Sequence, residues 1–406
     1  MRILTINCGS SSIKADIIEL SDAADCSRVA AISAAGLPDK PQGRLRTKAG
    51  DAAVDIVAGA PYAATLGALL DCLEERGFLN RVDAAGHRVV HGGPYLTDPA
   101  IIDQGVLRRI EAATRLAPLH NGPALEAIGV CAARLPAGTP MVATFDTGFF
   151  AGLPVEAATY AIPAAIARKL SIRRYGFHGL AHRFMSQRID ALSGRRDLRV
   201  VTLQLGAGCS AAAIRAGAAI DTSMGFTPLE GLVMSTRSGD IDPSLPAYIA
   251  GATGMSGDEV ERILNEESGL LGLSGTSGDV RELLKAEALG ESAAALALDV
   301  FCYRIRRYVG AYAAALGGLD AIGFGGGIGE NSPEIRDRVC RGFEWLGLSI
   351  DPAANQRCRG LEGLISNHDS RVACHVIAVD EAQVIAADTL RCLSESRRGR
   401  VNHGRQ

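Results

Sequence analysis

The residues RILTINCGSSSIKADIIEL (2–20) predict two strands joined by a turn of small residues, Cys8–Ser12. The residues RVVTLQLGAGCSAAAIRAGAAIDTS (199–223) repeat this order around the turn Gly206–Ser210. Such a turn presents backbone N–H groups and hydroxyls together, which suits a phosphate, and Lys14 supplies a counter-charge in the first copy. The alternative is an ordinary hairpin turn. The repeat predicts a duplicated α/β fold with a phosphate-binding turn in each half.

Length and composition describe a globular protein. The 406 residues are too many for one ordinary core, so we expect two domains. Hydrophobic residues make up 47% of the chain, charged residues 21%, and the net charge is −3. This balance gives no reason to expect a nucleic acid or an anionic membrane surface as a partner.

The cysteines and the apolar stretches indicate the compartment. The ten cysteines stand singly, without a CxxC pair, as expected for reduced thiols. The N-terminus lacks the apolar region of a signal peptide. Every apolar stretch is broken by a charge before the roughly 18 residues that span a bilayer. We therefore expect a cytoplasmic protein.

Hydrophobic spacing and chain breakers predict the remaining elements. Four leucines at helical spacing, closed by Gly77, predict one helix, namely Leu66, Leu69, Leu70 and Leu73. Further strands are expected at 82–91, 141–145, from 320 and at 376–379, and helices at 124–133, 279–289, 291–316 and 382–394. The segments 44–60 and 116–123 are expected to be irregular. A glycine-rich turn follows the strand from 320, and Ser332 and Pro333 should begin the next helix.

Two arginines are candidates for binding an anion. Arg237 lies in DTSMGFTPLEGLVMSTRSGDIDP (221–243), beside a glycine and between hydroxyls, and its planar fork matches a carboxylate or phosphate. The alternative is a solvated arginine in a surface loop. Arg88 lies within the predicted strand 82–91, where a charge is costly unless it meets an anion. The alternative for Arg88 is an ion pair with a neighbouring carboxylate.

An aspartate and a histidine complete the candidate chemistry. Asp146 directly follows the strand 141–145, a usual place for a catalytic or metal-directed carboxylate, although a helix N-cap is the alternative. His178 stands between two glycines and could reach a ligand, or it could be a core histidine bonded to a carbonyl. His178 and His182 do not predict a zinc site, because the glutamate of HExxH is missing and Gly176 and Gly179 disfavour a helix.

Taken together, these motifs resemble the acetate kinase family, within the superfamily of acetate and sugar kinases, Hsc70 and actin. The matching stretches recur in the family's order from residue 6 to 389. They are INCGSSSIK, HRVVHGG, APLHN, FDTGF, YGFHG, DTSMGFTPLEGL, TRSGDIDP, GGIGENS and DEAQVIAADT.

The resemblance implies an α/β fold of two duplicated ribonuclease-H-like domains with a nucleotide cleft between them. The first would span 1–148, and a last helix at 384–396 would return to it. The second would span 149–383 and carry the dimer interface and the adenosine site, with 397–406 as a flexible tail. The resemblance also implies a homodimer that binds acetate or acetyl phosphate, with ATP or ADP as co-substrate and Mg²⁺, or Mn²⁺, as the metal.

The resemblance assigns roles by motif. Asn7 and Glu381 would hold the metal, and Lys14 would face the nucleotide phosphates. Catalytic residues would be Asp146, His178, Arg237 and His120. The acid would be bound by Arg88, Val90, Leu119, Phe177 and Pro228. The nucleotide would be surrounded by Gln204, Leu205, Gly206, Ala207, Gly208, Asp279, Val280, Arg281, Gly327, Ile328, Gly329, Glu330 and Asn331.

Three positions depart from the family pattern. Where the family usually has HLGNG, this chain has Gln204 and Ala207, so an imidazole and an amide are lost from the nucleotide cradle. Ser235 replaces a usual glycine just before Thr236 and Arg237. The two loop glycines, 206 and 208, remain, so the loop can still approach a phosphate.

Two alternatives to an acetate kinase stay open. The first is a kinase for a longer acid, propionate or butyrate, with Val90 as the decisive wall of the pocket. The second is a nucleotide-dependent binding protein of the same superfamily that catalyses no reaction.

Because acetate is already ionised at neutral pH, we expect Asp146 to orient Arg88 or a metal-bound water rather than to act as a base.

Overall fold

The computed structural model describes residues 1–9, 12–21, 26–37 and 40–403, and it leaves out the side chains of 118, 119 and 399–403. Ser10 and Ser11 of the first predicted turn lie outside the described residues. The chain forms two compact units. Unit 1 comprises Met1–Phe149 and Asp380–Gln406, and unit 2 comprises Phe150–Val379. Among the described residues, every helix is too short or too polar to cross a membrane.

Unit 1 is built on an eight-stranded sheet in the order β5-β4-β3-β2-β1-β6-β8-β7. Strands β1 to β5 pair antiparallel, whereas β1, β6 and β8 run parallel to one another. The strands are β1 (Arg2–Cys8), β2 (Ser12–Leu20), β3 (Cys26–Ala35), β4 (Gln42–Thr47), β5 (Gly50–Val54), β6 (Ala84–Val89), β7 (Ala100–Ile101) and β8 (Met141–Phe145). The α-helices are α1 (Tyr62–Glu75), α2 (Gln104–Ala113), α3 (Pro118–Arg134) and α15 (Glu381–His403).

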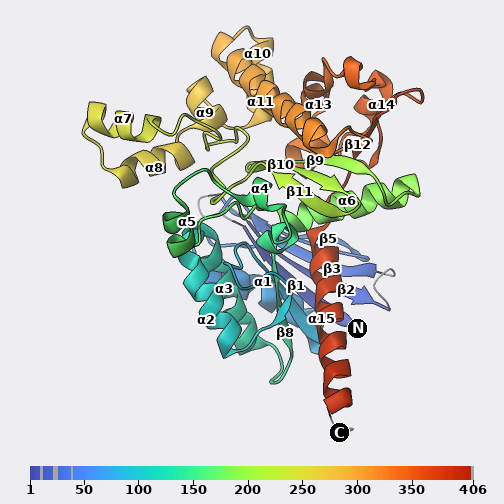
Figure 1. The fold of residues 1–406 in the computed structure, drawn as a ribbon. Coiled ribbons are helices and arrows are strands. Elements are labelled where there is room, and N and C mark those ends of the chain that lie inside the picture. Colours follow the sequence, from blue (N-terminus) through green and yellow to red (C-terminus); the bar gives the residue numbers. More distant parts are fainter. Residues whose placement is uncertain (10–11, 22–25, 38–39, 404–406) are drawn as a thin grey trace. The chain divides into compact units, whose positions relative to one another are not determined.

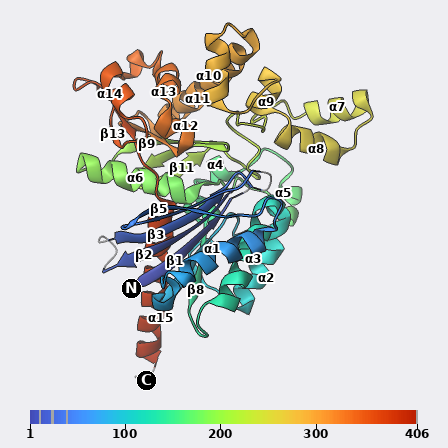
Figure 2. The same cartoon turned by 180° about the vertical axis from the view of Figure 1, so that it is seen from behind.

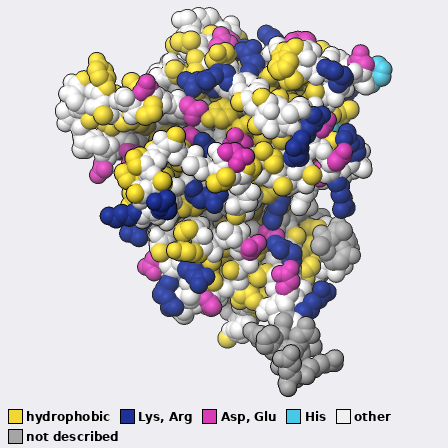
Figure 3. All heavy atoms as spheres, in the orientation of Figure 1, with side chains coloured by type: hydrophobic (Ala, Val, Ile, Leu, Met, Phe, Trp, Pro, Cys, Tyr) yellow, Lys and Arg dark blue, Asp and Glu magenta, His cyan; other side chains and the backbone are white. Residues whose placement is uncertain are grey.

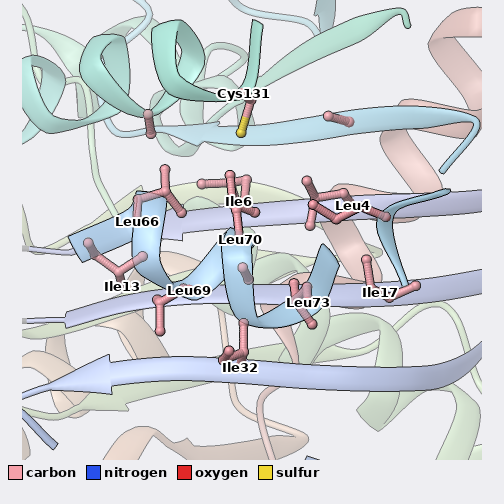
Figure 4. Close-up of a cluster of buried hydrophobic side chains, with 14 of the residues drawn as sticks. Leu4, Ile6, Ile13, Ile17, Ile32, Leu66, Leu69, Leu70, Leu73 and Cys131 are labelled. Carbon is pink, nitrogen blue, oxygen red and sulfur yellow. The ribbon is translucent and has the colours of Figure 1, made fainter. Parts of the chain in front are cut away.

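The two faces of this sheet are covered by different helices (Figures 1 and 2). Side chains alternate across a strand, so Leu4 packs on the face of α1 and α3, whereas Ile3 packs against α15. The leucines predicted to line one helix, Leu66, Leu69, Leu70 and Leu73, are all buried in the first cluster, which Figure 4 shows. Hydrophobic burial on both faces therefore fixes the sheet.

Unit 2 contains a six-stranded sheet in the order β11-β10-β9-β12-β14-β13. Its strands are β9 (Arg199–Leu205), β10 (Cys209–Arg215), β11 (Ala218–Thr222), β12 (Ala321–Gly325), β13 (Gly363–Leu364) and β14 (Ala373–Val376). Its α-helices are α4 (Val155–Ala158), α5 (Ala164–Leu170), α6 (Gly179–Ser193), α7 (Leu245–Thr253), α8 (Gly257–Glu266), α9 (Gly269–Ser274), α10 (Val280–Ala288), α11 (Ser292–Leu316), α12 (Gly326–Asn331), α13 (Pro333–Cys340) and α14 (Pro352–Arg357). Helix α6 packs on β9 and β12, and α11 packs on β10.

The predicted duplication is visible in the strand order. The run β3-β2-β1-β6-β8 of unit 1 corresponds to β11-β10-β9-β12-β14 of unit 2. In both runs the first three strands are antiparallel and the last three are parallel. The α/β fold class with two repeated ribonuclease-H-like sheets is therefore confirmed. The predicted hairpins are β1–β2 and β9–β10, one in each unit.

Several local predictions were wrong. The segment 44–60 is irregular only in its second part, because β4 and β5 extend the sheet beyond β3 as far as Val54. The segment 116–123 belongs mostly to α3, which has Pro118 in its first turn and also contains Pro123. The glycine-rich turn after β12 is the short helix α12, whose first N–H, that of Gly326, bonds to the carboxylate of Glu330. Short polar segments carried too weak a periodicity to predict these elements.

Three element ends also differ from expectation. Helix α6 begins at Gly179, so the glycine there did not prevent a helix. Helix α15 continues to His403, beyond the predicted end at 396 and into the predicted tail. Strand β14 ends at Val376, where the strand was expected to begin. The predicted start of α13 is confirmed, because Ser332 accepts a hydrogen bond from the N–H of Ile335 and Pro333 is the first helical residue.

Candidate active site

Four predicted site residues form one hydrogen-bonded cluster in unit 1. The Arg88 guanidinium donates from Nη2 to Asp146 Oδ2 at 2.6 Å and from Nε to both oxygens of Asp146 at 3.2 Å. Its Nη1 donates to Asn7 Oδ1 at 2.9 Å. Asn7 Nδ2 in turn donates to Glu381 Oε2 at 2.6 Å. The ion-pair alternative considered for Arg88 is therefore what the structure contains.

Parallel strands bring these residues together. Asn7 lies at the end of β1, Arg88 at the end of β6, and Asp146 directly follows β8. Because parallel strands end at the same edge of a sheet, three segments far apart in the sequence meet there. Glu381 joins them as the first residue of α15. The site is thus a product of the sheet topology.

Electrostatics hold Arg88 in its charged form. The Asp146 side chain is fully buried, and that of Arg88 is only 11% exposed. Burial alone lowers the pKa of Arg88, but the charges of Asp146 and Glu381 and the hydrogen bonds to Asp146 raise it overall. Because two nitrogens of the planar Arg88 guanidinium donate to the same carboxylate, the guanidinium has a fixed orientation.

The other predicted residues of unit 1 have more varied surroundings. Val90 is buried and lies just after β6, one residue beyond the last strand position. The exposed Lys14 is the cross-strand partner of Asn7, so the two side chains lie on the same face of the sheet. His120 is half-buried in the first turn of α3. The Leu119 side chain lies outside the described residues.

Two residues that were not singled out hold the segment after Arg88. Asn121 is fully buried, and its amide accepts from the His91 N–H and donates to the His91 carbonyl. Thr147 Oγ1 accepts from the Gly92 N–H at 3.0 Å. A Cβ atom at Gly92 would lie 1.9 Å from the carbonyl oxygen of Leu96, so only glycine fits. Asn121 and Thr147 belong to the motifs APLHN and FDTGF, which was the available sequence signal.

In unit 2, His178 and Arg237 lie against the same glycine. A Cβ atom added at Gly208 would be 3.5 Å from Arg237 Nη1 and 3.6 Å from His178 Nε2. Gly208 is the last residue of the loop between β9 and β10 and lies within the predicted phosphate turn Gly206–Ser210. The structure therefore brings two predicted catalytic side chains to the predicted phosphate loop.

The segment 221–243 forms the frame around Arg237. Its apolar residues Leu232, Val233 and Met234 are buried. Arg237 Nη1 donates to the Pro228 carbonyl oxygen at 3.4 Å. Among the described residues Arg237 has no ion pair, and burial lowers its pKa. A solvated surface arginine is therefore excluded.

A pocket of about 1190 Å³ in unit 2 unites the three predicted nucleotide segments. It is lined by Gly206, Ala207, Asp279, Val280, Arg281, Gly327, Ile328 and Asn331. Asp279 caps α10 through the N–H of Arg281 and also forms an ion pair with the side chain of Arg281. The other predicted cradle residues, Gln204, Leu205, Gly208, Gly329 and Glu330, do not line this pocket.

Comparison with known proteins identifies the family. The model of the acetokinase family matches residues 2–387. The chain belongs to the acetokinase family. The acetate kinase of Thermotoga maritima is 44% identical over 400 residues, which cover 96% of this chain and 98% of that protein.

Solved structures agree with this assignment. Porphyromonas gingivalis acetate kinase superposes with a TM-score of 0.87 at 37% identity, covering 97% of this chain and 99% of that one. A propionate kinase from Francisella tularensis superposes with a TM-score of 0.88 at 38% identity, covering 95% and 98% of the two chains. The overall structural similarity therefore does not show whether this chain prefers acetate or propionate.

The two residues expected to depart from the family pattern, Gln204 and Ala207, lie behind and in the wall of this pocket. Ala207 lines the pocket, and its carbonyl accepts from the N–H of Ser235, another lining residue. Gln204 lies behind the loop, where a Cβ atom at Gly326 would be 3.1 Å from Gln204 Nε2. Gln204 Oε1 is buried and has no hydrogen-bond partner among the described residues. Ala207 therefore contributes to the wall of the pocket, and Gln204 lies behind the loop that carries it.

The apolar residues expected to bind the acid belong to both units. Phe177 is buried and Pro228 is half-buried in unit 2, whereas Val90 and Leu119 belong to unit 1. Glu330 does not line the pocket; its carboxylate accepts from the N–H groups of Gly326 and Val379 and so holds the loop.

Proposed function

We propose that this protein is an acetate kinase, which reversibly transfers the γ-phosphoryl group of ATP to acetate and gives acetyl phosphate and ADP. The observation that carries the proposal is the junction of pocket and cations in unit 2. Gly206 and Ala207 line a nucleotide-sized pocket, and His178 and Arg237 lie against Gly208, the next residue of the chain. A nucleotide whose phosphates follow this loop presents its γ-phosphoryl group to the side chains of His178 and Arg237.

Arg88 is proposed to bind the carboxylate of acetate. Acetate is ionised at neutral pH, so its attack on phosphorus needs no base. Both oxygens of Asp146 already accept hydrogen bonds from Arg88. We therefore assign Asp146 to orienting Arg88, while Val90, Leu119, Phe177 and Pro228 surround the methyl group and His120 lies near the phosphoryl group.

Asn7 and Glu381 are proposed to hold Mg²⁺, or Mn²⁺ in its place, directly or through water. An amide oxygen and a carboxylate are suitable hard donors, and a Mg²⁺ site usually takes its remaining ligands from water and substrate phosphates. Among the described residues, no group of three or more His, Cys, Asp and Glu could hold a metal by itself. When bound, the metal neutralises charge on the β- and γ-phosphates, and Lys14 adds a further positive charge.

The chemistry imposes one further requirement on the two clusters. In-line transfer needs the acid oxygen and the phosphorus within contact distance, and repulsion between two anions must be neutralised. The acid-binding group Arg88 belongs to unit 1, and the phosphoryl-binding groups His178 and Arg237 belong to unit 2. We therefore propose that each unit supplies part of the binding groups, unit 1 for the acid and unit 2 for the phosphoryl group.

Trapping the product with hydroxylamine tests this proposal directly. Acetyl phosphate reacts with hydroxylamine to give acetohydroxamate, so ATP, Mg²⁺ and acetate should yield hydroxamate with the wild-type protein. ADP formation measured in parallel should match it. Nucleotide binding without hydroxamate from any short-chain acid would instead support a non-catalytic binding protein.

A longer acid is the second candidate, favoured by the likeness to the Francisella tularensis propionate kinase. One additional methylene changes binding in an apolar pocket by only about 1–3 kcal/mol, so Val90 can decide the preference. Values of kcat/KM for acetate, propionate and butyrate measure it. The variant Val90→Ala should shift the preference towards the longer acids.

We also propose a homodimer, supported by the helix pair α7 and α8 of unit 2. Helix α7 has an apolar sequence but no buried residue, and Tyr248 on it is 72% exposed. Figure 3 shows hydrophobic side chains at this surface. A second copy would cover them, which light scattering would detect as a doubled mass that Tyr248→Glu reduces. The ten cysteines stand singly in the sequence, without a CxxC pair, which supports the cytoplasm as the compartment.

A further inference from the structure

A chain of buried side chains extends away from His178. Its Nδ1 lies 2.8 Å from Ser210 Oγ, and the same oxygen lies 2.8 Å from His182 Nε2. His182 Nδ1 then lies 2.7 Å from Thr202 Oγ1. Ser210, His182 and Thr202 are all fully buried. The four groups therefore form a continuous hydrogen-bonded row that ends inside the core of unit 2.

The fold of unit 2 places this row on one face of its sheet. Thr202 on β9 pairs with Ala212 on β10, and Gln204 pairs with Ser210, so Thr202 and Ser210 point to the same side. Helix α6 packs on β9, and His182 is in its first turn. The ring of Phe150 meets that of His182 edge-on at 5.9 Å between centroids. Packing therefore fixes the His182 ring as well as its hydrogen bonds.

The backbone at His178 is also unusual. His178 has φ +57°, a left-handed conformation that few residues other than glycine adopt. It occupies the N-cap position of α6, but its side chain makes no capping hydrogen bond. The side chain contacts Ser210 instead. A strained backbone that gives up a helix cap is typical of a functional position.

Counting protons shows what the row can do. Burial, and then the charge of His178, lower the pKa of His182 well below its ordinary value, so His182 is neutral and carries one N–H. The hydroxyl of Ser210 has one proton and can donate to only one of the two imidazoles. If Thr202 donates to His182 Nδ1, then His182 Nε2–H donates to Ser210, and Ser210 donates to His178 Nδ1. Neutral His178 then carries its proton on Nε2.

The opposite polarity has the opposite consequence. If His182 Nδ1–H donates to Thr202, then Ser210 donates to His182 and His178 Nδ1–H donates to Ser210. Neutral His178 then has a lone pair on Nε2, the nitrogen beside Gly208, and only the imidazolium could donate there. A lone pair facing a phosphoryl oxygen is repulsive, so the first polarity suits phosphoryl transfer.

We propose that His182 and Ser210 are positioning residues, which fix the ring of His178 and keep its proton on Nε2, the nitrogen beside Gly208. This rests on the proposed function of His178 as a donor to the transferring phosphoryl group. The row makes a hydrogen-bond donor available at pH values where His178 is neutral. His182, rejected as a zinc ligand from the sequence alone, thereby acts through Ser210 without touching substrate.

Variants of the row test the proposal by the pH dependence of kcat. Ser210→Ala and His182→Phe should each lower kcat about tenfold to hundredfold near pH 8, the range typical when a group that orients a functional side chain is removed. The KM values for acetate and ATP should change little. The loss should shrink near pH 6, because the imidazolium form of His178 donates from both nitrogens. His182→Gln retains an amide donor and should recover part of the activity.

Controls separate positioning from a structural defect. Ser186→Ala removes another buried hydroxyl of α6, which lies outside the row, and should leave kcat unchanged. In a His178→Ala background, Ser210→Ala should cause no further loss, because its effect passes through His178. Arg237 is a charged group and His182 a titratable group beside His178. Arg237→Lys keeps the charge at 237 and serves as the reference for the pH profile.

The outcomes are decisive either way. Two results would overturn the positioning role. One is a kcat within threefold of wild type for Ser210→Ala. The other is a loss that is equal at both pH values and that adds to the loss caused by His178→Ala. Imidazole nitrogen NMR of the wild-type protein gives an answer that does not depend on activity. A proton on Nε2 of neutral His178 supports the proposal, and one on Nδ1 refutes it. Absence of hydroxamate would instead defeat the kinase function.

Discussion

The two site arginines are both shielded from solvent, but only Arg88 is paired with a carboxylate. Arg88 in unit 1 makes three hydrogen bonds to Asp146 and one to Asn7, and its pKa is raised. Arg237 in unit 2 has no ion pair among the described residues, donates to the Pro228 carbonyl, and has a lowered pKa. A buried cation without a carboxylate gains most when an anion arrives, whereas a compensated one gains least. We infer that Arg88 positions a substrate and that Arg237 stabilises charge formed during transfer.

Removing Arg237 should have the largest effect. Arg237→Ala is expected to lower kcat by about 10³–10⁵, the range seen for arginines that stabilise transferring phosphoryl groups. The folded protein should lose little stability, because no buried carboxylate is left behind. Steady-state kinetics and thermal unfolding measure both quantities. Arg195→Ala, at an exposed ion pair of the same unit, is the control. A loss below tenfold would remove Arg237 from the transition state.

Removing Arg88 should have the opposite consequences, with a smaller effect on kcat and a larger loss of stability. Arg88→Ala should mainly raise the KM for the acid, with a smaller effect on kcat unless its contacts tighten in the transition state. It should also destabilise the protein by about 3–5 kcal/mol, because the buried Asp146 carboxylate loses its partner. Chemical denaturation measures the free energy of unfolding. An unchanged free energy of unfolding would show that the Asp146 carboxylate finds another partner or becomes protonated. The proposed difference between Arg88 and Arg237 would then be wrong.

Asp146→Asn sharpens the comparison within unit 1. An asparagine keeps one oxygen acceptor for Arg88, so a purely orienting role predicts a loss in kcat/KM of about tenfold to hundredfold. A general base would be essential, and its loss would cost about 10²–10⁴. A double-mutant cycle with Arg88→Ala should show strong coupling, because the two side chains share their hydrogen bonds. Additive effects would indicate that Asp146 acts on another group.

The smallest expected effect concerns the pocket of unit 2. Ala207→Asn should restore an amide to its wall and tighten ADP binding by about tenfold, as a hydrogen bond to a charged phosphate contributes about 1.5–3 kcal/mol. Isothermal titration calorimetry gives the dissociation constant directly. Ala207→Val adds volume without a donor and should not tighten binding. Equal tightening by both variants would show that packing rather than the amide matters.

Many of the candidate site residues could be named from the sequence, because they lie at ends of apolar strands or within motifs that resemble the family's. Asn7, Arg88 and Asp146 each stand where a hydrophobic run gives way to polar residues, and Gly206–Gly208 mark the loop of the second hairpin. The row behind His178 was missed. Thr202 and Ser210 are small residues inside strands, and their sequence neighbours carry no sign that a histidine from α6 bonds to them. Only the register of β9 and β10 brings them together.

The sequence by itself determined the duplicated α/β fold, the family and the identity of the candidate residues, because strand periodicity and glycine-rich turns are local properties. The tertiary structure decided which charges are compensated. That Arg88 meets Asp146 while Arg237 meets a carbonyl depends on which strand and loop ends adjoin, 58 residues apart in the first case and nine in the second. Burial then turns these contacts into shifts of pKa, since the energy of a charge depends on its surroundings rather than on its neighbours in sequence.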